Sequence, residues 1–262
     1  MTKVQFVSRA DDLGSSLSAN KAIAAVTRAG FIKNVSVMAP GPFVPEAAEL
    51  LKNRKDLCFG LHTTLNSEWS GIKWGPILPS EQLPGLVDAN GAFLSDPKMF
   101  KATKPAVETV MREVAAQLEY VHRLGFDIRY IDSHMFPELF IPGLDEAMAD
   151  FARKKGLLDH MYFYALPPGF MQIMQQPKKL PRYLMTIPKG QYFFVTHPSL
   201  NTEEMRRHSG EDIAKARAKE TALFSKKATS AALKLFGCGG IRYDAATPHK
   251  RTTVEDVKAL FL

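Results

Sequence analysis

Short apolar segments alternate with amphipathic segments along most of this chain. Apolar residues fill 4–7, 35–38 and 57–61, whereas 17–29 and 46–52 carry apolar residues at helical spacing. Such alternation is typical of parallel βα units, in which helices cover a parallel sheet. We therefore expect an α/β fold, with its chemistry at the carboxyl ends of the strands, where such sheets gather their sites.

The same alternation continues towards the C-terminus. Valine and leucine recur every three or four residues over 106–123, which predicts a half-buried helix. No linker, internal repeat or low-complexity tract interrupts the pattern, so we expect residues 1–262 to form a single domain. The other expected elements are strands at 128–134, 161–166, 191–196 and near Ile241, and helices at 144–155, at 211–224 and after a capping box that pairs Thr252 with Glu255.

Residues 65–104 break this alternation. Prolines and glycines recur throughout the stretch, and an irregular insertion loop of this length is usually a lid or a binding loop. Both tryptophans of the chain, Trp69 and Trp74, lie in it. Their rings would either stack on the rings of a sugar or anchor the insertion to the body of the domain.

The composition excludes several classes of protein. Hydrophobic residues make up 45% of the chain, too many for a wholly disordered protein, and no apolar run reaches the ~20 residues of a membrane span. The N-terminus lacks the apolar core of a secretory signal, and Cys58 and Cys238 suggest neither a disulfide framework nor a CxxC metal site. We therefore expect a cytoplasmic protein. The net charge of +7 permits anionic partners, but no nucleic-acid-binding motif accompanies it.

Ionisable residues stand at the expected ends of four strands. Asp12, His62 and His134 are far apart in the sequence, yet each follows or ends an apolar segment. Two imidazoles and one carboxylate can hold a divalent metal and leave positions open for water and substrate. The other residues at strand ends are Asp11, beside Asp12; Asp132, two residues before His134; and His197, after the strand at 191–196.

These neighbouring residues have separate expected roles. Asp11 is suited to take a proton from water, and His197 to give one to a leaving amine. Asp132 lies on the same strand face as His134, so it either orients that imidazole or caps the next loop. Each residue also has a structural interpretation, since an Asp-Asp-Leu-Gly turn commonly opens a helix and a single histidine is commonly structural. Neighbours on a strand point to opposite faces, so Asp11 and Asp12 converge only if the chain bends in the glycine turn that follows.

A series of short motifs runs along nearly the whole chain. They are Ala10-Asp-Asp-Leu-Gly14, Asn20-x-x-Ile23, Ser36-Val-Met38 with Gly41-Pro42, Gly60-Leu-His62, Leu86-Val-Asp88 with Gly91 and Phe93, Ile131-Asp-Ser-His134, Thr196-His-Pro198, and Arg217-x-x-Glu220 with the later Gly240-Ile241. Together, and in this order, the motifs resemble those of the YdjC-like carbohydrate deacetylases, the group that contains the ChbG-type chitooligosaccharide deacetylase.

The resemblance implies a fold and a site. The fold is a distorted, TIM-barrel-like (βα) barrel, and the assembly is a homodimer. One divalent metal ion is held by Asp12, His62 and His134, with Asp11 as general base and His197 as general acid. Magnesium and zinc are the leading candidates for this metal. Residues expected behind the ligands or against the substrate are Asp132, Arg217, Trp69 and Trp74.

Two departures from the family pattern lie near the expected site. Met135 and Phe136 occupy positions where family members often carry further histidines, and Ser199 replaces the glycine of a His-Pro-Gly motif. The first departure leaves the expected ligands in place, but it bears on the surroundings of the metal and on the substrate.

The resemblance implies removal of N-acetyl groups from amino-sugar oligosaccharides such as chitobiose. A stretch without acidic residues, 160–202, contains Lys178, Lys179, Arg182 and Lys189, which either meet a phosphorylated sugar or lie in a solvated loop. Two other functions stay open: a hydrolase that cleaves another bond in a phospho-disaccharide, and a non-catalytic sugar-binding protein. The expected partner is thus a small oligosaccharide, and we expect neither nucleic acid nor a membrane to bind.

Overall fold

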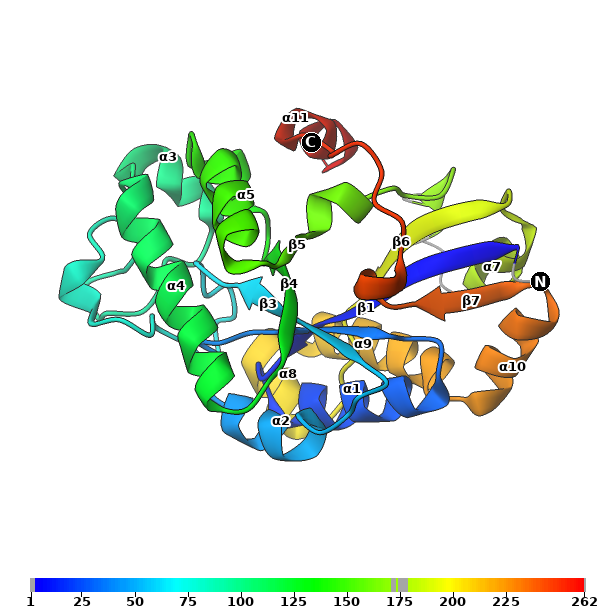
Figure 1. Cartoon of the computed structure of the whole chain (residues 1–262). Helices are drawn as coiled ribbons and strands as arrows, with labels where there is room; N and C mark the ends of the chain where they lie inside the picture. The colour runs from blue at the N-terminus through cyan, green and yellow to red at the C-terminus, as the bar shows by residue number, and fades with distance from the viewer. Residues whose placement is uncertain (1–2, 171–172, 174–178, 262) are drawn as a thin grey trace.

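The computed structural model describes every residue except 1–2, 171–172, 174–178 and 262. Seven strands of the described chain form one curled, parallel sheet with helices on its outer side (Figure 1). The strand order is β5-β4-β3-β2-β1-β6, and β7 also pairs with β1. The strands are β1 (Val4–Leu13), β2 (Asn34–Val37), β3 (Cys58–Thr63), β4 (Ile128–Ser133), β5 (Leu158–Asp159), β6 (Gly190–Thr196) and β7 (Cys238–Ile241).

Local capping fixes the ends of the helices. The first helix begins after Ser16, whose hydroxyl accepts a hydrogen bond from the Ala19 N–H at 2.9 Å, and it stops at Gly30 in the left-handed conformation. No helix in the described part of the chain has the length and hydropathy that a bilayer crossing requires. The α-helices are α1 (Leu17–Ala29), α2 (Val44–Leu51), α3 (Phe100–Thr103), α4 (Val107–Arg123), α5 (Leu144–Lys155), α7 (Leu180–Thr186), α8 (Glu203–Ser209), α9 (Glu211–Phe224), α10 (Lys227–Leu235) and α11 (Val254–Phe261).

Strand β1 has the most partners in the sheet, because β2, β6 and β7 all pair with it. β6 pairs along residues 4–10, β7 along 4–7 and β2 along 9–13. Every residue of β1 except Gln5 is buried, as expected of a parallel strand that is covered on both faces. The expected α/β fold is confirmed, and β1 delivers its carboxyl end to the middle of the molecule.

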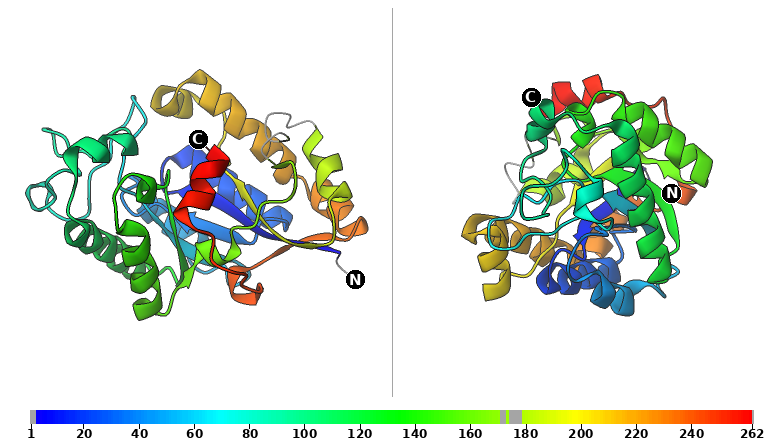
Figure 2. Two further views of the ribbon diagram at one scale, coloured as in Figure 1. Left: turned by 90° about the horizontal axis from the view of Figure 1, so that it is seen from above. Right: turned by 90° about the vertical axis from the view of Figure 1, so that its left-hand side faces the viewer.

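The sheet curls without closing. Within the described residues, β5 at one edge and β6 at the other each pair with a single neighbour, so the sheet is a half-barrel. Helix α11 lies above the sheet in Figure 1, and therefore in front of it in the left-hand view of Figure 2, which is seen from above. The curl brings the carboxyl ends of β1, β3 and β4 towards one another, which is the condition that the expected site requires.

The insertion at 65–104 is mostly irregular and is tied to the body by buried groups. It contains α3 and the short 3₁₀ turns η1 (Ser80–Gln82) and η2 (Pro97–Met99). The Glu113 carboxylate of α4 accepts the backbone N–H groups of Ile77 and Leu78 at 2.9 and 3.0 Å. Trp69 and Trp74 are each only 3% exposed and pack edge to face, so their burial favours the anchoring interpretation.

Several expectations about individual elements need correction. The strand expected at 161–166 is wrong: residues His160–Phe163 form the 3₁₀ turn η4, capped by the Asp159 side chain, which accepts the Met161 N–H. Helices α7, α8 and α10 were not expected from the sequence. The capping box of α11 lies one residue later than expected, because Thr253 and Asp256 exchange the two hydrogen bonds.

Candidate metal centre

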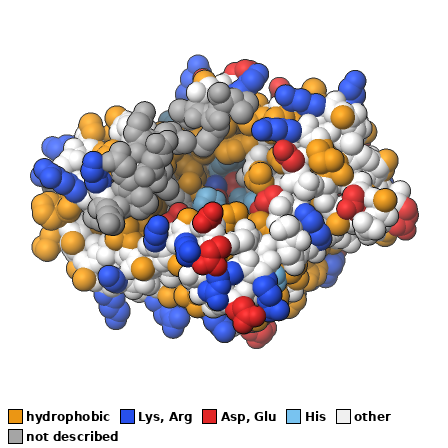
Figure 3. All heavy atoms as spheres, turned by 180° about the vertical axis from the view of Figure 1, so that it is seen from behind, with side chains coloured by type: hydrophobic (Ala, Val, Ile, Leu, Met, Phe, Trp, Pro, Cys, Tyr) orange, Lys and Arg blue, Asp and Glu red, His pale blue; other side chains and the backbone are white. Residues whose placement is uncertain are grey.

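Three expected ligands converge where β1, β3 and β4 end. Asp12 Oδ1 lies 3.4 Å from His62 Nε2 and 3.4 Å from His134 Nδ1. The two imidazole nitrogens are 3.2 Å apart, and all three residues are buried. A single cation can therefore reach one oxygen and two nitrogens. Figure 3 shows histidine and acidic side chains at the floor of a hollow on the face opposite to Figure 1.

A bend in β1 separates the two neighbouring aspartates. Asp12 itself has φ +67°, in the left-handed region, and the pairing register with β2 shifts between Ala10 and Leu13. The bend expected near Gly14 thus begins two residues earlier. It turns Asp12 towards the histidines while Asp11 stays on the strand face that carries Arg9. A left-handed non-glycine residue of this kind is often found at functional sites.

The Asp12 carboxylate is charged but accepts no hydrogen bond from the described residues. Burial alone would raise its pKa, but the Arg217 charge and the two imidazoles hold that pKa well below its usual range. The Arg217 Nη1 atom lies 2.6 Å from Asp12 Oδ2, which leaves Oδ1 facing His62 and His134. A buried, ionised and unsatisfied oxygen beside two imidazoles is the donor set of a divalent metal site, so these residues fit such an ion.

A carboxylate lies behind His62. The Nδ1 atom of His62 is hydrogen-bonded to Asp132, so Nε2 faces the centre. Asp132 is held by Arg9 Nη1 at 2.8 Å and by the Ser36 hydroxyl. Asp132 therefore orients His62, not His134 as the strand pattern suggested, and it does not cap the next loop. Burial would lower the pKa of His62, but Asp132 and nearby carboxylates outweigh it and raise that pKa to about 9.

A different carboxylate lies behind His134. Glu68 Oε2 is 3.0 Å from His134 Nε2, which leaves Nδ1 facing the centre. Burial would lower the pKa of His134, but Glu68 and Asp12 raise it to about 10. Sequence reasoning missed Glu68, because it lies inside the irregular insertion and no periodic pattern marks it. Without a cation, the surrounding carboxylates thus favour the protonated forms of the two imidazoles.

Arg9 is a second residue that sequence reasoning missed. Its guanidinium donates to both oxygens of Asp11, at 2.6 and 2.7 Å, and both side chains are buried. Single acceptor atoms of Asp11, His62 and Asp132 also lie within 4.8 Å of one another. An arginine inside an apolar strand is a signal that this reasoning could have used, because a buried guanidinium requires anionic partners.

Helix α9 supports the end of β6. Glu220 Oε2 accepts the backbone N–H of His197 at 2.7 Å and also pairs with the Thr196 hydroxyl. Ala10 of β1 pairs with Thr196 of β6 in the sheet. His197 therefore lies just after the end of β6, next to the strand that carries the two aspartates. Arg217 and Glu220 are three residues apart, which places both on one face of α9, towards the site.

The residues after His134 are strained. Met135 and Phe136 have φ of +56° and +49°, both left-handed. The Met135 sulfur lies 3.1 Å from Asn66 Nδ2, and the Phe136 ring packs edge-on against Tyr164. Met135 and Phe136, in place of the expected histidines, thus form an apolar turn directly after His134 in the chain.

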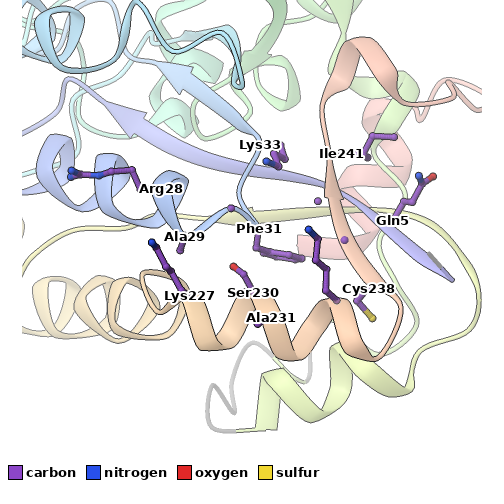
Figure 4. A pocket seen from close by; sticks show the side chains of 14 residues that line it. Gln5, Arg28, Ala29, Phe31, Lys33, Lys227, Ser230, Ala231, Cys238 and Ile241 are labelled. Carbon is purple, nitrogen blue, oxygen red and sulfur yellow. The ribbon is translucent and has the colours of Figure 1, made fainter. Parts of the chain in front are cut away.

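Two further basic features of the chain are a cavity at the amino end of the sheet and the segment expected to meet a phosphorylated sugar. A cavity of about 460 Å³ at the amino end of the sheet is lined by Lys33, Lys227 and Lys234, among others (Figure 4). Gln5 also lines this cavity. It lies seven residues before Asp12 on β1, which corresponds to about 23 Å along an extended strand, so the cavity is distant from Asp12. Of the lysines and arginine expected to meet a phosphorylated sugar, Lys178 lies outside the described residues, and the others are exposed: Lys179, Arg182 and Lys189. Arg182 lies in helix α7 and Lys179 is its N-cap residue, so this segment is not the solvated loop of the alternative expectation.

Sequence comparison places the chain among known proteins. The family described as YdjC-like protein matches residues 7–164. A protein of Thermoanaerobacter pseudethanolicus named carbohydrate deacetylase is 28% identical over 125 residues, 48% of this chain and 47% of that one. Carbohydrate deacetylase 1 of Listeria innocua is 29% identical over 149 residues, 56% of this chain and 58% of that one. The chain spans about half the length of the curated relatives it matches.

Structural comparison extends the similarity over the whole fold. A crystal structure from Enterococcus faecalis V583, described as a candidate cellobiose-phosphate cleavage protein, superposes with a TM-score of 0.76. The match covers 93% of this chain and 98% of that one at 20% sequence identity. The expected distorted, TIM-barrel-like architecture is therefore confirmed.

Proposed function

Since this chain belongs to the YdjC-like protein family, we propose that it is a metal-dependent hydrolase that removes N-acetyl groups from amino-sugar oligosaccharides. The convergence of Asp12, His62 and His134 on one point carries the proposal. Relatives named carbohydrate deacetylase support the class of reaction. A chitobiose-like oligosaccharide, neutral or phosphorylated, is the substrate that we propose.

Amide hydrolysis requires a nucleophile, a base and an acid. When bound, a divalent cation lowers the pKa of water towards about 7 and polarises the acetyl carbonyl. Asp11 takes the proton of the attacking water, and the two N–H groups of Arg9 fix the plane of its carboxylate. His197, in its protonated form, donates to the departing amine, a contribution of roughly 10²–10⁴-fold in rate.

We consider two candidate metals for these ligand atoms, zinc and magnesium. Two imidazole nitrogens and one carboxylate suit Zn²⁺, and Mg²⁺ is the alternative that we keep, although it prefers oxygen ligands. The described cysteines, Cys58 and Cys238, are both free and buried, which agrees with a reducing, cytoplasmic location. We also propose a homodimer, on the family resemblance alone.

Two measurements on purified protein test this function. Metal content is determined by elemental analysis, and acetate release is measured on N,N′-diacetylchitobiose and on its phosphate. We expect Asp12→Asn to lose bound metal and activity together, whereas Asp11→Asn keeps the metal and loses turnover. Asp127→Asn, at an exposed aspartate, is the matched control and should change neither. Near-full activity of Asp11→Asn would show that the base is assigned wrongly.

A second reaction is compatible with this fold and this site. The Enterococcus faecalis structure, described with cleavage of cellobiose phosphate, favours hydrolysis of a glycosidic bond in a phospho-disaccharide. Release of free sugar without acetate, from the same two substrates, would select this alternative. Binding of either substrate with no product, and tolerance of Asp11→Asn, would instead indicate a sugar-binding protein.

A further inference from the structure

The insertion contributes a carboxylate to the back of the metal centre. Glu68 Oε2 lies 3.0 Å from His134 Nε2, and the Glu68 side chain is 21% exposed. The same oxygen accepts a hydrogen bond from Asn66 Nδ2 at 3.1 Å. Because Glu68 is held on two sides, its position is set by the folding of the insertion and not by solvent.

This contact decides which nitrogen of His134 is free. A neutral imidazole carries one N–H group and one lone pair. When Nε2 donates its proton to Glu68, the lone pair stands on Nδ1, the atom that faces Asp12 and His62. A carboxylate partner also makes the opposite nitrogen a more basic ligand, and loss of such a partner typically lowers metal affinity 10- to 100-fold.

The next residue of the insertion reaches a second ligand. The Arg217 guanidinium lies 5.2 Å from the centre of the Trp69 ring, and its Nη1 atom pairs with Asp12. The insertion is fixed close by, because the Gly71 N–H donates to the His208 carbonyl at 3.2 Å. Two consecutive residues, Glu68 and Trp69, thus support two of the three ligands from behind.

We propose that Glu68 is a positioning residue. Through its contact with His134, cation binding depends on the docking of the insertion at 65–104 against the rest of the domain. The inference rests on the metal centre of the proposed function, and it adds a coupling between that centre and the insertion. By linkage, a bound cation in turn tightens the insertion. Glu68 touches no substrate in this scheme and acts only through His134.

The chain carries its own reporter for this coupling. Both of its tryptophans lie in the insertion, and Trp69 is the residue next to Glu68. Titration of Co²⁺ into metal-free protein is followed by isothermal calorimetry, by tryptophan fluorescence and by the visible spectrum of the bound ion. Glu68→Ala removes the carboxylate, whereas Glu68→Gln keeps the shape of the side chain but not the charge. Glu81→Gln, at an exposed position in the same insertion, is the matched control.

In the wild type and in Glu81→Gln, we expect Co²⁺ to bind and to change the fluorescence. In Glu68→Ala, the Kd should rise 10- to 100-fold, with a smaller rise in Glu68→Gln. At saturating Co²⁺, the fluorescence change should be reduced and the visible spectrum altered in Glu68→Ala. Wild-type affinity, spectrum and fluorescence response in both variants would overturn the positioning role and leave the metal centre intact. A wild type that binds no Co²⁺, Zn²⁺ or Mg²⁺ would overturn the proposed function, and this inference with it.

Discussion

Cation binding at the Asp12–His62–His134 centre should release about two protons for each ion at pH 7. Without a cation, the neighbouring carboxylates raise the pKa of His62 to about 9 and that of His134 to about 10, which favours the protonated form of both imidazoles. A metal requires a free lone pair on one nitrogen of each ring. The protons and the cation therefore compete for the same two nitrogens.

The size and sign of the effect follow from these pKa values. They lie about 2 and 3 pH units above pH 7, so displacement of both protons costs about 7 kcal/mol at that pH. Both pKa values are raised above the ordinary value of a histidine, so affinity for the cation falls as the pH falls. Below pH 9, each pH unit should change the association constant about 100-fold, which is the signature of two displaced protons.

Isothermal calorimetry with Zn²⁺ measures this directly. The protein is titrated at pH 6.5, 7 and 8 in pairs of buffers with different ionisation enthalpies, and the proton count is the slope of the measured enthalpy against the buffer enthalpy. Ionisation of a water on the ion adds to this count, so the prediction is a lower bound. His122→Asn, at an exposed position in the last turn of α4, is the control. Release of less than one proton at pH 7, or an affinity that does not depend on pH, would refute the reasoning.

Three further outcomes follow from single contacts. Asp132→Asn should lower cation affinity 10- to 100-fold in the same titration, because the carboxylate behind His62 is lost. Gly60→Ala should lower the free energy of unfolding by about 1–3 kcal/mol in a urea titration, because a Cβ atom would lie 2.2 Å from the Tyr130 ring; an unchanged midpoint would contradict this packing. Glu138 has a buried, unpaired Oε2 atom, and burial raises its pKa to about 7, so its ionisation costs stability as the pH rises through 7. Glu138→Gln should therefore raise the Tm at pH 8, with little effect at pH 5, and an equal effect at both values would exclude that cause.

Local signals predicted the elements whose ends are capped. α1 and α5 match their expected bounds because Gly30 and Gly156 adopt the left-handed conformation that ends a helix. The expected strand at 161–166 failed, since Phe163 and Tyr164 pack inward at a 3₁₀ turn, whereas Tyr162 is exposed. Apolar and aromatic composition alone cannot distinguish a strand from a 3₁₀ turn here, because both can bury the same apolar side chains.

The candidate ligands of the centre were predictable for a topological reason, whereas the residues that support them were not. Parallel strands deliver their carboxyl ends to one edge, so Asp12, His62 and His134 could be grouped from strand order alone. No such topological rule locates Arg9 or Glu68. Each is fixed by a contact between segments whose relative placement follows only from the packed structure, and each escapes a search for ligand residues because it acts behind the ligands.

The Asp11–Asp12 pair explains why β1 departs from a regular strand at its end. A regular strand would send the two carboxylates to opposite faces of the sheet, and only one could reach the centre. The left-handed turn at Asp12 changes the direction of that side chain alone, while Asp11 stays on the face that carries Arg9. Such strain costs about 1–3 kcal/mol and persists only where the surroundings enforce it. Here the Arg217 ion pair and two carboxylate-backed imidazoles supply that constraint, so the proposed metal ligand and the proposed base lie side by side at the end of β1.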